Sequence, residues 1–146
     1  MALRGSTPKA DKNMATLDTL TAKDYMNSQM VTLAPDTDVM AAINIFVRRG
    51  IGSAPVVAED GRLLGMLSEK DCLKAALTAS YEGSAGGPIK EFMSDKTVTV
   101  APETTLLEVA SMFVDSNFKR YPVVKEGKLL GLISRANVLR AINDHS

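Results

Sequence analysis

Hydrophobic and polar positions along the chain follow one order of elements, and its most regular part begins at Ala54. The pattern predicts a buried strand, a tight polar turn, a second strand and a helix that ends near Leu77. The turn is Glu59-Asp60-Gly61, whose acidic residues and glycine are typical of a hairpin. Ser68 with Asp71 three residues later indicates where the helix begins. This stretch therefore predicts a hairpin followed by a capped helix.

The same stretch returns at residues 121–137, almost position for position. Pro122 lies 67 residues after Pro55, and Gly131 lies 66 residues after Gly65, so one turn residue has been lost. At Gly65, the missing side chain would let another backbone or a ligand approach closely. A chance match of one tripeptide would not bring these further residues with it. The chain therefore contains an internal duplication.

Further elements precede the hairpin in both copies. Short helical turns are predicted at 21–26 and 87–93, short strands ended by proline at 31–35 and 98–102, and long helices at 38–49 and 105–116. One apolar face of each long helix is expected to be buried; its residues are Val39, Ala42, Ile43, Phe46 and Val47, and Leu106, Val109, Ala110, Phe113 and Val114. Gly50 and Asn117 stand just past the helix ends, where a left-handed C-cap is expected.

Each copy thus reads as helix turn–β–α–β–β–α, with last helices at 68–77 and 134–142. A small sheet with helices on one face leaves its other face apolar, and the other copy is the simplest cover for it. We expect an α/β fold of two small mixed sheets, stacked with pseudo-twofold symmetry. The expected organisation is a flexible tail (1–20), a first domain (21–80), a linker (81–87) and a second domain (88–146).

Composition and charge narrow the possible partners. The 146 residues are 45% hydrophobic, and 17 basic residues balance 17 acidic residues. Nothing in this balance favours nucleic acid or anionic lipid, and no stretch has the length of a membrane span. The N-terminus lacks the pattern of a secretion signal. These features predict a soluble, cytoplasmic protein that binds neither nucleic acid nor membrane.

The inventory of reactive side chains argues against an enzyme. Cys72 is the only cysteine, so the chain has no intrachain disulfide and no multi-cysteine metal site. His145, the only histidine, is the next-to-last residue, where a chain end usually frays. A catalytic group built on Ser or Cys with His would have to use it. Cys72, between apolar neighbours, is expected to be a buried packing residue. We predict no catalytic residues and no metal.

The repeated order of elements, with Pro-Val-Val, Leu-Leu-Gly and a final Ser-x-x-Asp, resembles the CBS domain, named for cystathionine β-synthase. Two such domains in tandem resemble the Bateman module, and the resemblance covers residues 21–143. It implies a regulatory module whose clefts bind adenosine-containing ligands. AMP, ADP or ATP are the expected ligands, S-adenosylmethionine and NAD rank below them, and no cofactor is required.

The resemblance implies two unequal clefts, each drawing on both copies. The first would combine Ser68, Lys70, Asp71, Ala101, Lys119, Arg120 and Pro122, with adenine against Ala101 and Pro122. The second would combine Ala34, Gly52, Ser53, Pro55, Ser134 and Asn137. Asn137 replaces the family's aspartate and lacks its charge, with Arg135 as partial compensation, so this second cleft is expected to be weak or empty.

The chemistry of the first cleft is coherent by itself. The ionised carboxylate of Asp71 has two acceptor oxygens, which suit the paired hydroxyls of a ribose. Ser68 lies at a helix N-terminus, where free N–H groups and the helix dipole favour a phosphate. Lys70, Lys119 and Arg120 would supply positive charge to phosphates, and arginine can bind them bidentately.

Simpler interpretations stay open. Ser-x-x-Asp is also a plain capping box that needs no ligand, and a pair of basic residues is often only solvated. A ligand-independent dimerisation or protein-interaction module is therefore the alternative to a nucleotide sensor. The resemblance also implies a homodimer and an unidentified protein target. Candidates for the dimer surface are Met40, Ala41, Met112 and the helix at 73–77.

Overall fold

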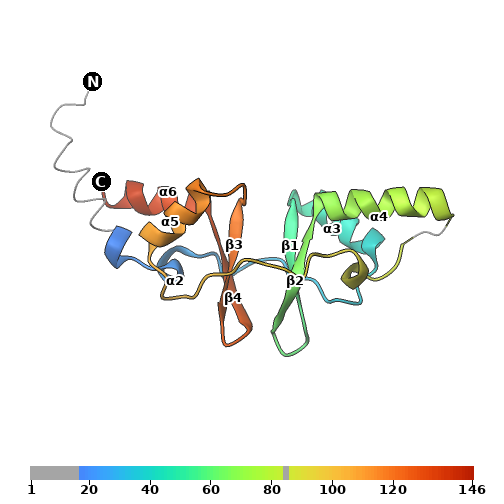
Figure 1. The fold of residues 1–146 in the computed structure, drawn as a ribbon, viewed down its shortest axis with the longest axis horizontal. Helices are drawn as coiled ribbons and strands as arrows, with labels where there is room; N and C mark the ends of the chain where they lie inside the picture. Colours follow the sequence, from blue (N-terminus) through green and yellow to red (C-terminus); the bar gives the residue numbers. More distant parts are fainter. Residues whose placement is uncertain (1–16, 84–85) are drawn as a thin grey trace, which may run out of the picture. The chain divides into compact units, whose positions relative to one another are not determined.

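The computed structural model describes residues 17–83 and 86–146, and it divides into two compact units (Figure 1). Unit 1 contains residues 17–29, Val98–Glu126 and Leu130–Ser146. Unit 2 contains Met30–Thr97 and Gly127–Leu129. Most of the tail predicted at 1–20 and part of the linker predicted at 81–87 lie outside the described residues.

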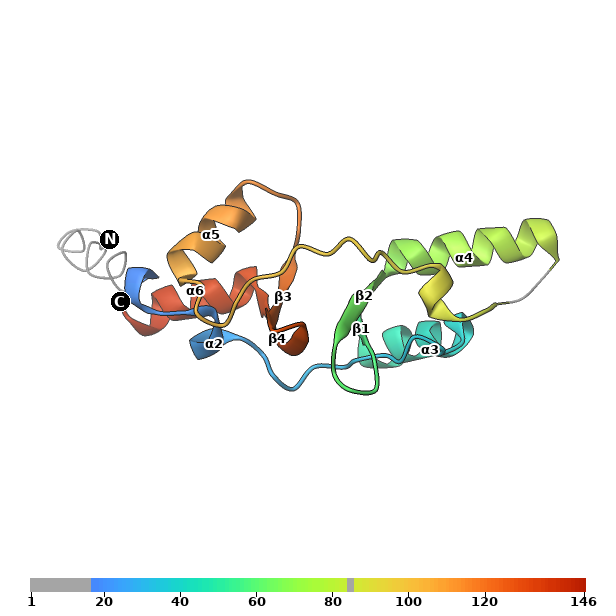
Figure 2. The same cartoon turned by 60° about the horizontal axis from the view of Figure 1, so that its bottom comes forward.

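Unit 2 is built on an antiparallel hairpin of β1 (Ser53–Val57) and β2 (Leu63–Ser68). The register runs from Ser53 opposite Ser68 to Val56 opposite Gly65, and a bulge follows. Helices α3 (Val39–Arg49) and α4 (Glu69–Glu82) lie on one side of this hairpin in both ribbon views (Figures 1 and 2). A 3-10 turn, η1 (Ile89–Glu91), completes the unit.

Unit 1 repeats this plan. Its elements are α2 (Ala22–Tyr25), α5 (Leu106–Val114), the paired strands β3 (Arg120–Lys125) and β4 (Lys128–Ser134), and α6 (Arg135–Asp144), although the first two residues of β4 are counted with unit 2. Residues 17–19 add a helical turn, and the Leu17 side chain is only 2% exposed. The folded part of unit 1 therefore starts before residue 21. The expected α/β class with two small sheets is confirmed.

Each unit takes its leading helical turn from the other sequence copy. Helix α2 precedes the first hairpin in sequence but belongs to unit 1, where the Ala22 N–H donates to the Thr104 carbonyl at 2.8 Å. Turn η1 precedes the second hairpin but belongs to unit 2, where the Ile89 N–H donates to the Thr37 carbonyl at 2.8 Å. The sequence repeat and the compact unit are thus different sets of residues.

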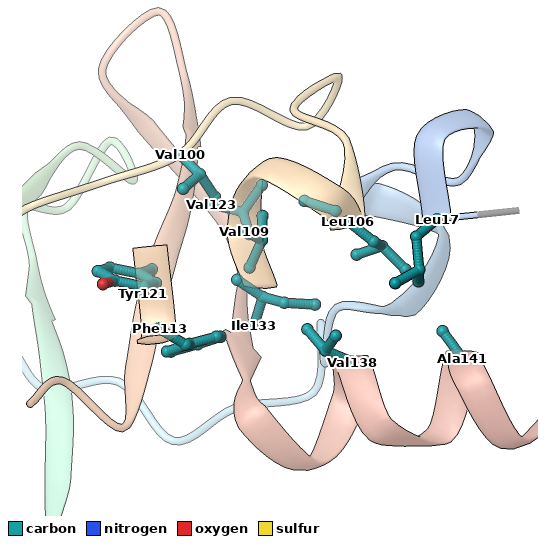
Figure 3. Close-up of a cluster of buried hydrophobic side chains, with 11 residues drawn as sticks. Leu17, Val100, Leu106, Val109, Phe113, Tyr121, Val123, Ile133, Val138 and Ala141 are labelled. Atoms are coloured by element: carbon teal, nitrogen blue, oxygen red, sulfur yellow. The ribbon is translucent and has the colours of Figure 1, made fainter. Parts of the chain in front are cut away.

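Each unit has its own hydrophobic core. In unit 1 (Figure 3) the buried side chains are Leu17, Ala22, Val100, Leu106, Val109, Phe113, Tyr121, Val123, Ile133, Val138 and Ala141. In unit 2 they are Leu33, Val39, Ala42, Phe46, Ala54, Val56, Leu67, Cys72, Ala75 and Ile89. Burial of Cys72 confirms its predicted packing role. Each core therefore includes a residue of the helical turn that comes from the other sequence copy: Ala22 of α2 in unit 1 and Ile89 of η1 in unit 2.

Two details of the predicted apolar faces and strands are wrong. Val47 and Val114 are 76% and 84% exposed, because the buried stripe of each long helix is narrower than the predicted one. The strands predicted at 31–35 and 98–102 are single parallel bridges, Leu33 to Val56 and Val100 to Val123. Proline follows two residues after Leu33 and after Val100 and lacks the N–H that a longer ladder needs.

The helix ends follow the prediction only in part. Gly50 takes the left-handed conformation at φ 64°, as predicted. Asn117 does not, because Glu126 is the only residue other than glycine with positive φ in the described ranges. Helix α5 already ends at Val114. Helix α4 runs past the predicted Leu77 to Glu82 and ends at Gly83, where φ is 72°.

Two glycines admit the leading segments, and the close approach predicted at Gly65 is that of another backbone. A Cβ atom at Gly131 would lie 2.8 Å from the Met26 sulfur and 2.9 Å from the Asn27 carbonyl oxygen. At Gly65 it would meet the Ser94 carbonyl oxygen and, at 2.9 Å, the Met93 sulfur. The backbone pairs at the same places, Asn27 with Leu132 and Met66 with Ser94. A side chain at either glycine would therefore push away the segment that the unit has received.

Replacing one of these glycines is expected to destabilise the fold. In Gly131→Ala the new methyl overlaps backbone, and overpacking of this kind costs about 1–3 kcal/mol. Urea unfolding measures the loss. Gly52→Ala is the matched control, because its methyl would meet only the end of the flexible Glu69 side chain, at 3.0 Å. Equal stability of both variants would contradict the proposed close approach.

The Cys72 thiol is expected to be protected. It is 6% exposed, and burial together with the carboxylates of Asp71 and Glu69 raises its pKa. Since the thiolate is the nucleophile, DTNB should modify native protein about 100-fold more slowly than urea-unfolded protein at neutral pH.

The raised pKa also predicts a pH dependence of stability. The unfolded thiol ionises near pH 8.5 while the folded one keeps its proton, so the contribution of Cys72 to the free energy of unfolding falls as the pH rises from about 8.5. Cys72→Ala should lack that contribution, and equal DTNB rates for native and unfolded protein would refute the protection.

Candidate functional site

The N-terminus of α4 carries the predicted ribose motif, and it is a complete capping box. The Asp71 Oδ2 atom accepts from the Ser68 N–H at 2.9 Å and from the Ser68 hydroxyl at 3.0 Å. The Asp71 N–H in turn donates to the Ser68 hydroxyl oxygen at 3.2 Å. Both residues are half-buried. The cap uses Oδ2, whereas Oδ1 accepts no hydrogen bond within the described chain.

The N-terminus of α6 has the same cap without the charge. The Ser134 N–H donates to the Asn137 Oδ1 atom at 2.8 Å, and the Asn137 N–H donates to the Ser134 hydroxyl oxygen at 3.2 Å. The hydroxyl-to-carboxylate bond of α4 has no counterpart here. An amide therefore suffices for the cap, and the extra negative charge at Asp71 is not needed to begin a helix.

Residues assigned to different clefts adjoin one another inside unit 2. Ser53 is the cross-strand partner of Ser68, and the Glu69 N–H donates to the Gly52 carbonyl at 3.0 Å. The Glu69 carboxylate covers Gly52, with Oε1 3.0 Å from the position of a Cβ atom there. The start of α4 thus places Asp71 and Glu69 on the edge that Gly52 and Ser53 form.

The corresponding edge of unit 1 is positively charged. Lys119 precedes β3, Arg120 begins it, and Arg135 begins α6 where β4 ends. Within residues 17–83 and 86–146, none of the three forms an ion pair. Their counterparts in unit 2 are Gly52, Ser53 and Glu69. Arg135 and Glu69 therefore carry opposite charge at equivalent places, whereas Lys119 and Arg120 correspond to uncharged residues.

The remaining predicted residues fall into two groups. Lys70, Ala34 and Ala101 are exposed, Lys70 on α4 and the alanines beside the bridges of their units. Pro55 and Pro122 are buried, and their carbonyls accept from the N–H groups of Leu33 and Val100, both at 2.9 Å. That burial indicates that the prolines shape their strands. The grouping of residues from both units around one ligand stays a prediction.

Sequence reasoning missed two features of these edges. One is Glu69, whose only signal is its place directly after the capping serine. The other is Tyr121, which looks like a strand residue in sequence but has a hydroxyl bonded to Ser116 at 2.8 Å and to the Met112 carbonyl at 3.1 Å. Its partners are five and nine residues away, a spacing that matches no simple local motif.

Two other kinds of site are absent from the part of the chain that the structure describes. No group of three or more His, Cys, Asp or Glu side chains there is placed to hold a metal ion. No helix among those residues has the length and apolar character needed to cross a membrane.

The chain is similar to known proteins over most of its length. It is 30% identical over 125 residues to the CBS domain-containing protein YhcV of Bacillus subtilis, and the match covers 85% of each chain. It is 26% identical over 134 residues to the uncharacterized protein MJ1225 of Methanocaldococcus jannaschii, covering 92% of this chain but 47% of that protein. The chain thus spans about half the length of this relative.

Solved structures show the same fold. One of them is the crystal structure of CBSX2 in complex with AMP, which is 27% identical in sequence and superposes with a TM-score of 0.76. The match covers 86% of this chain and 97% of that chain. CBSX2 is a CBS-pair protein from Arabidopsis thaliana. The CBS domain family itself matches twice, at residues 22–78 and 89–144, one match over each copy of the duplication. This chain therefore belongs to the CBS domain family and contains two CBS domains in tandem.

Proposed function

We propose that this protein is a regulatory module that binds an adenine nucleotide of the AMP, ADP or ATP type. The observation that carries the proposal is the free Oδ1 atom of Asp71 beside a cap that needs no carboxylate. Because an amide forms the same cap in α6, the negative charge of Asp71 is available to accept hydrogen bonds from the hydroxyls of a ribose. The AMP bound by CBSX2, a relative of the same fold, supports this choice of ligand class.

The basic edge of unit 1 supports a phosphorylated ligand. Lys119, Arg120 and Arg135 have no acidic partner in the described chain, so their charge is free to attract an anion. S-adenosylmethionine has a net positive charge and carries one carboxylate but no phosphate, so it gains less from them. Nucleotides therefore rank above S-adenosylmethionine, with NAD as a further candidate because it carries two phosphates.

Ligand binding would act by shifting populations and not by a reaction. A ligand changes a conformational equilibrium only by its difference in affinity between states. We propose that occupancy is passed to a protein target or to a second copy of the chain. In this view the protein is not an enzyme and requires no cofactor. A cytoplasmic location is part of the same proposal.

A ligand-independent dimerisation module is the second candidate, and one observation favours it. The side chains of Leu73, Leu77 and Tyr81 on α4 are 66%, 57% and 86% exposed. Their spacing of four residues places them along one face of the helix. An exposed apolar line of this kind is typical of a surface that meets another chain.

The nucleotide proposal predicts a loss of affinity without a loss of fold in Asp71→Asn. Asn137 shows that an amide forms this cap, so urea stability should stay within about 0.5 kcal/mol of the wild type. The affinity for AMP should fall about tenfold or more, since hydrogen bonds to a charged group contribute about 1.5–3 kcal/mol. Isothermal titration with AMP, ATP, S-adenosylmethionine and NAD measures this.

Asn137→Asp is the matched partner of that variant, because it gives the second copy the carboxylate of the first. It should raise the affinity or the number of sites for AMP. If none of the four compounds produces heat or thermal stabilisation in the wild type, the sensor proposal fails and the interaction module takes its place.

The interaction module makes its own prediction. Replacing Leu73 and Leu77 together by glutamate should dissociate any dimer that buries this face, because two buried charges are costly. Sedimentation velocity measures the mass of the particle. Since both side chains are exposed in the single chain, the circular dichroism spectrum should stay unchanged. A wild-type protein that sediments as a monomer at every concentration would exclude dimerisation through this face.

A further inference from the structure

Tyr121 lies at the margin of the unit 1 core, with its oxygen pointing away from the aliphatic side chains (Figure 3). The residue is 2% exposed, so its hydroxyl cannot rely on water. The hydroxyl donates to the Met112 carbonyl oxygen at 3.1 Å. A phenol has one proton, so the Ser116 hydroxyl, 2.8 Å away, must be the donor to the Tyr121 oxygen.

The chain of hydrogen bonds continues to the backbone. The Ser116 oxygen accepts from the Phe118 N–H at 3.3 Å. The order is thus Phe118 N–H to Ser116, Ser116 to Tyr121, and Tyr121 to the carbonyl of Met112. Each hydroxyl donates once and accepts once. Both ends of this chain are backbone groups, one in the connection after α5 and one in the last turn of α5.

The phenol of Tyr121 takes part in the end of α5. The last carbonyls of a helix lack partners within it and need a cap. In unit 2 the backbone of Gly50 turns left-handed and its N–H returns to the Phe46 carbonyl. In unit 1 the Asp115 N–H donates to the Ser111 carbonyl at 3.1 Å and the Ser116 N–H to the Phe113 carbonyl at 3.5 Å, and the phenol adds its bond to the Met112 carbonyl. The position of Tyr121 corresponds to Ala54, which has no such group.

The bond between Ser116 and Tyr121 also closes a short loop. The four residues between them are Asn117, Phe118, Lys119 and Arg120, so the loop contains two of the three basic residues of this edge. Aromatic packing also restrains the loop, because the centroid of the Tyr121 ring lies 4.7 Å from that of Phe113 and 5.6 Å from that of Phe118. Two flexible basic side chains thus start from a backbone that is tied at both ends.

We propose that Tyr121 is a positioning residue, which holds the backbone of Lys119 and Arg120 for the phosphate part of the ligand. This inference rests on the proposed nucleotide function. The phenol itself does not touch the ligand, because it is buried and both its hydrogen bonds are made within unit 1. Its effect is to remove backbone freedom that phosphate binding would otherwise have to restrict.

Tyr121→Phe tests the proposal, since it keeps the ring and removes both hydrogen bonds. Tyr25→Phe is the matched control: it also removes a phenol from unit 1, but that phenol donates to Asp144 at 2.8 Å, away from the loop. Hydrogen exchange of a peptide covering residues 115–121 measures the backbone. We expect exchange there to be about tenfold faster in Tyr121→Phe and unchanged in Tyr25→Phe.

Titration with ATP and with adenosine measures the consequence for the ligand. The ratio of the adenosine Kd to the ATP Kd reports the contribution of the phosphates alone. It should fall about tenfold in Tyr121→Phe, as when one charged hydrogen bond is lost, while the adenosine Kd stays constant. A general loss of structure would weaken both ligands together, so this split separates positioning from instability.

Ser116→Ala provides a second variant in case Tyr121→Phe unfolds, because it opens the loop and leaves the phenol bonded to Met112. It should change the exchange rate and the ratio in the same direction. Wild-type exchange in the 115–121 peptide of either folded variant would overturn the proposal, and so would an unchanged ratio. If the wild type binds neither ATP nor adenosine, the nucleotide function fails, and the positioning of a phosphate falls with it even where the loop has loosened.

Discussion

The structure depends on two places where a strand has no side chain. At Gly65 and Gly131 the backbone of a neighbouring segment comes so close that even a methyl group would not fit. The segment at Gly131 is Met26-Asn27, and it follows directly after α2. Because the strand admits this backbone, α2 can dock and Ala22 becomes fully buried in the unit 1 core. Gly65 does the same for η1, whose Ile89 is fully buried in unit 2. Both cores are therefore completed by residues from the other sequence copy.

The two copies have kept their geometry and changed their chemistry. Both last helices begin with serine and a side chain three residues later that returns to the serine N–H. In one copy that side chain is a carboxylate and in the other an amide. The residues around it differ in the same sense: Glu69 covers Gly52 in unit 2, whereas Lys119 and Arg135 stand at the equivalent positions of unit 1. The carboxylate of Asp71 thus belongs to one copy, and the basic residues belong to the other.

Local rules predicted the parts of this protein that local energies decide. Ser68 and Asp71 indicated a cap, Gly50 a left-handed helix end and Gly65 a close approach, and each depends on a few neighbouring atoms. The missed features depend on partners that spacing does not reveal. Asn117 was expected to cap α5, but the N–H groups of Asp115 and Ser116 return to that helix, and Tyr121 adds a bond from beyond it. The hydrophobic pattern of the sequence cannot show which unit α2 packs against, because it predicts only that Ala22 is buried. The candidate residues could be named, but their grouping depends on tertiary contacts.

If Asp71 binds a nucleotide as proposed, it joins stability and recognition in one side chain, and typical magnitudes show which of the two contributes more free energy. Its Oδ2 atom serves the cap, which stabilises a helix by about 1 kcal/mol. A ligand at 100 times its Kd stabilises the state that binds it by about 2.7 kcal/mol. The free energy contributed by a bound ligand would therefore exceed that of the cap when the ligand concentration is far above its Kd. The contribution of the cap would be the larger one when the ligand concentration is low. In the proposed nucleotide complex, a carboxylate that divides its two oxygens between helix and ligand would stabilise α4 in the empty form and bind the ribose in the filled one.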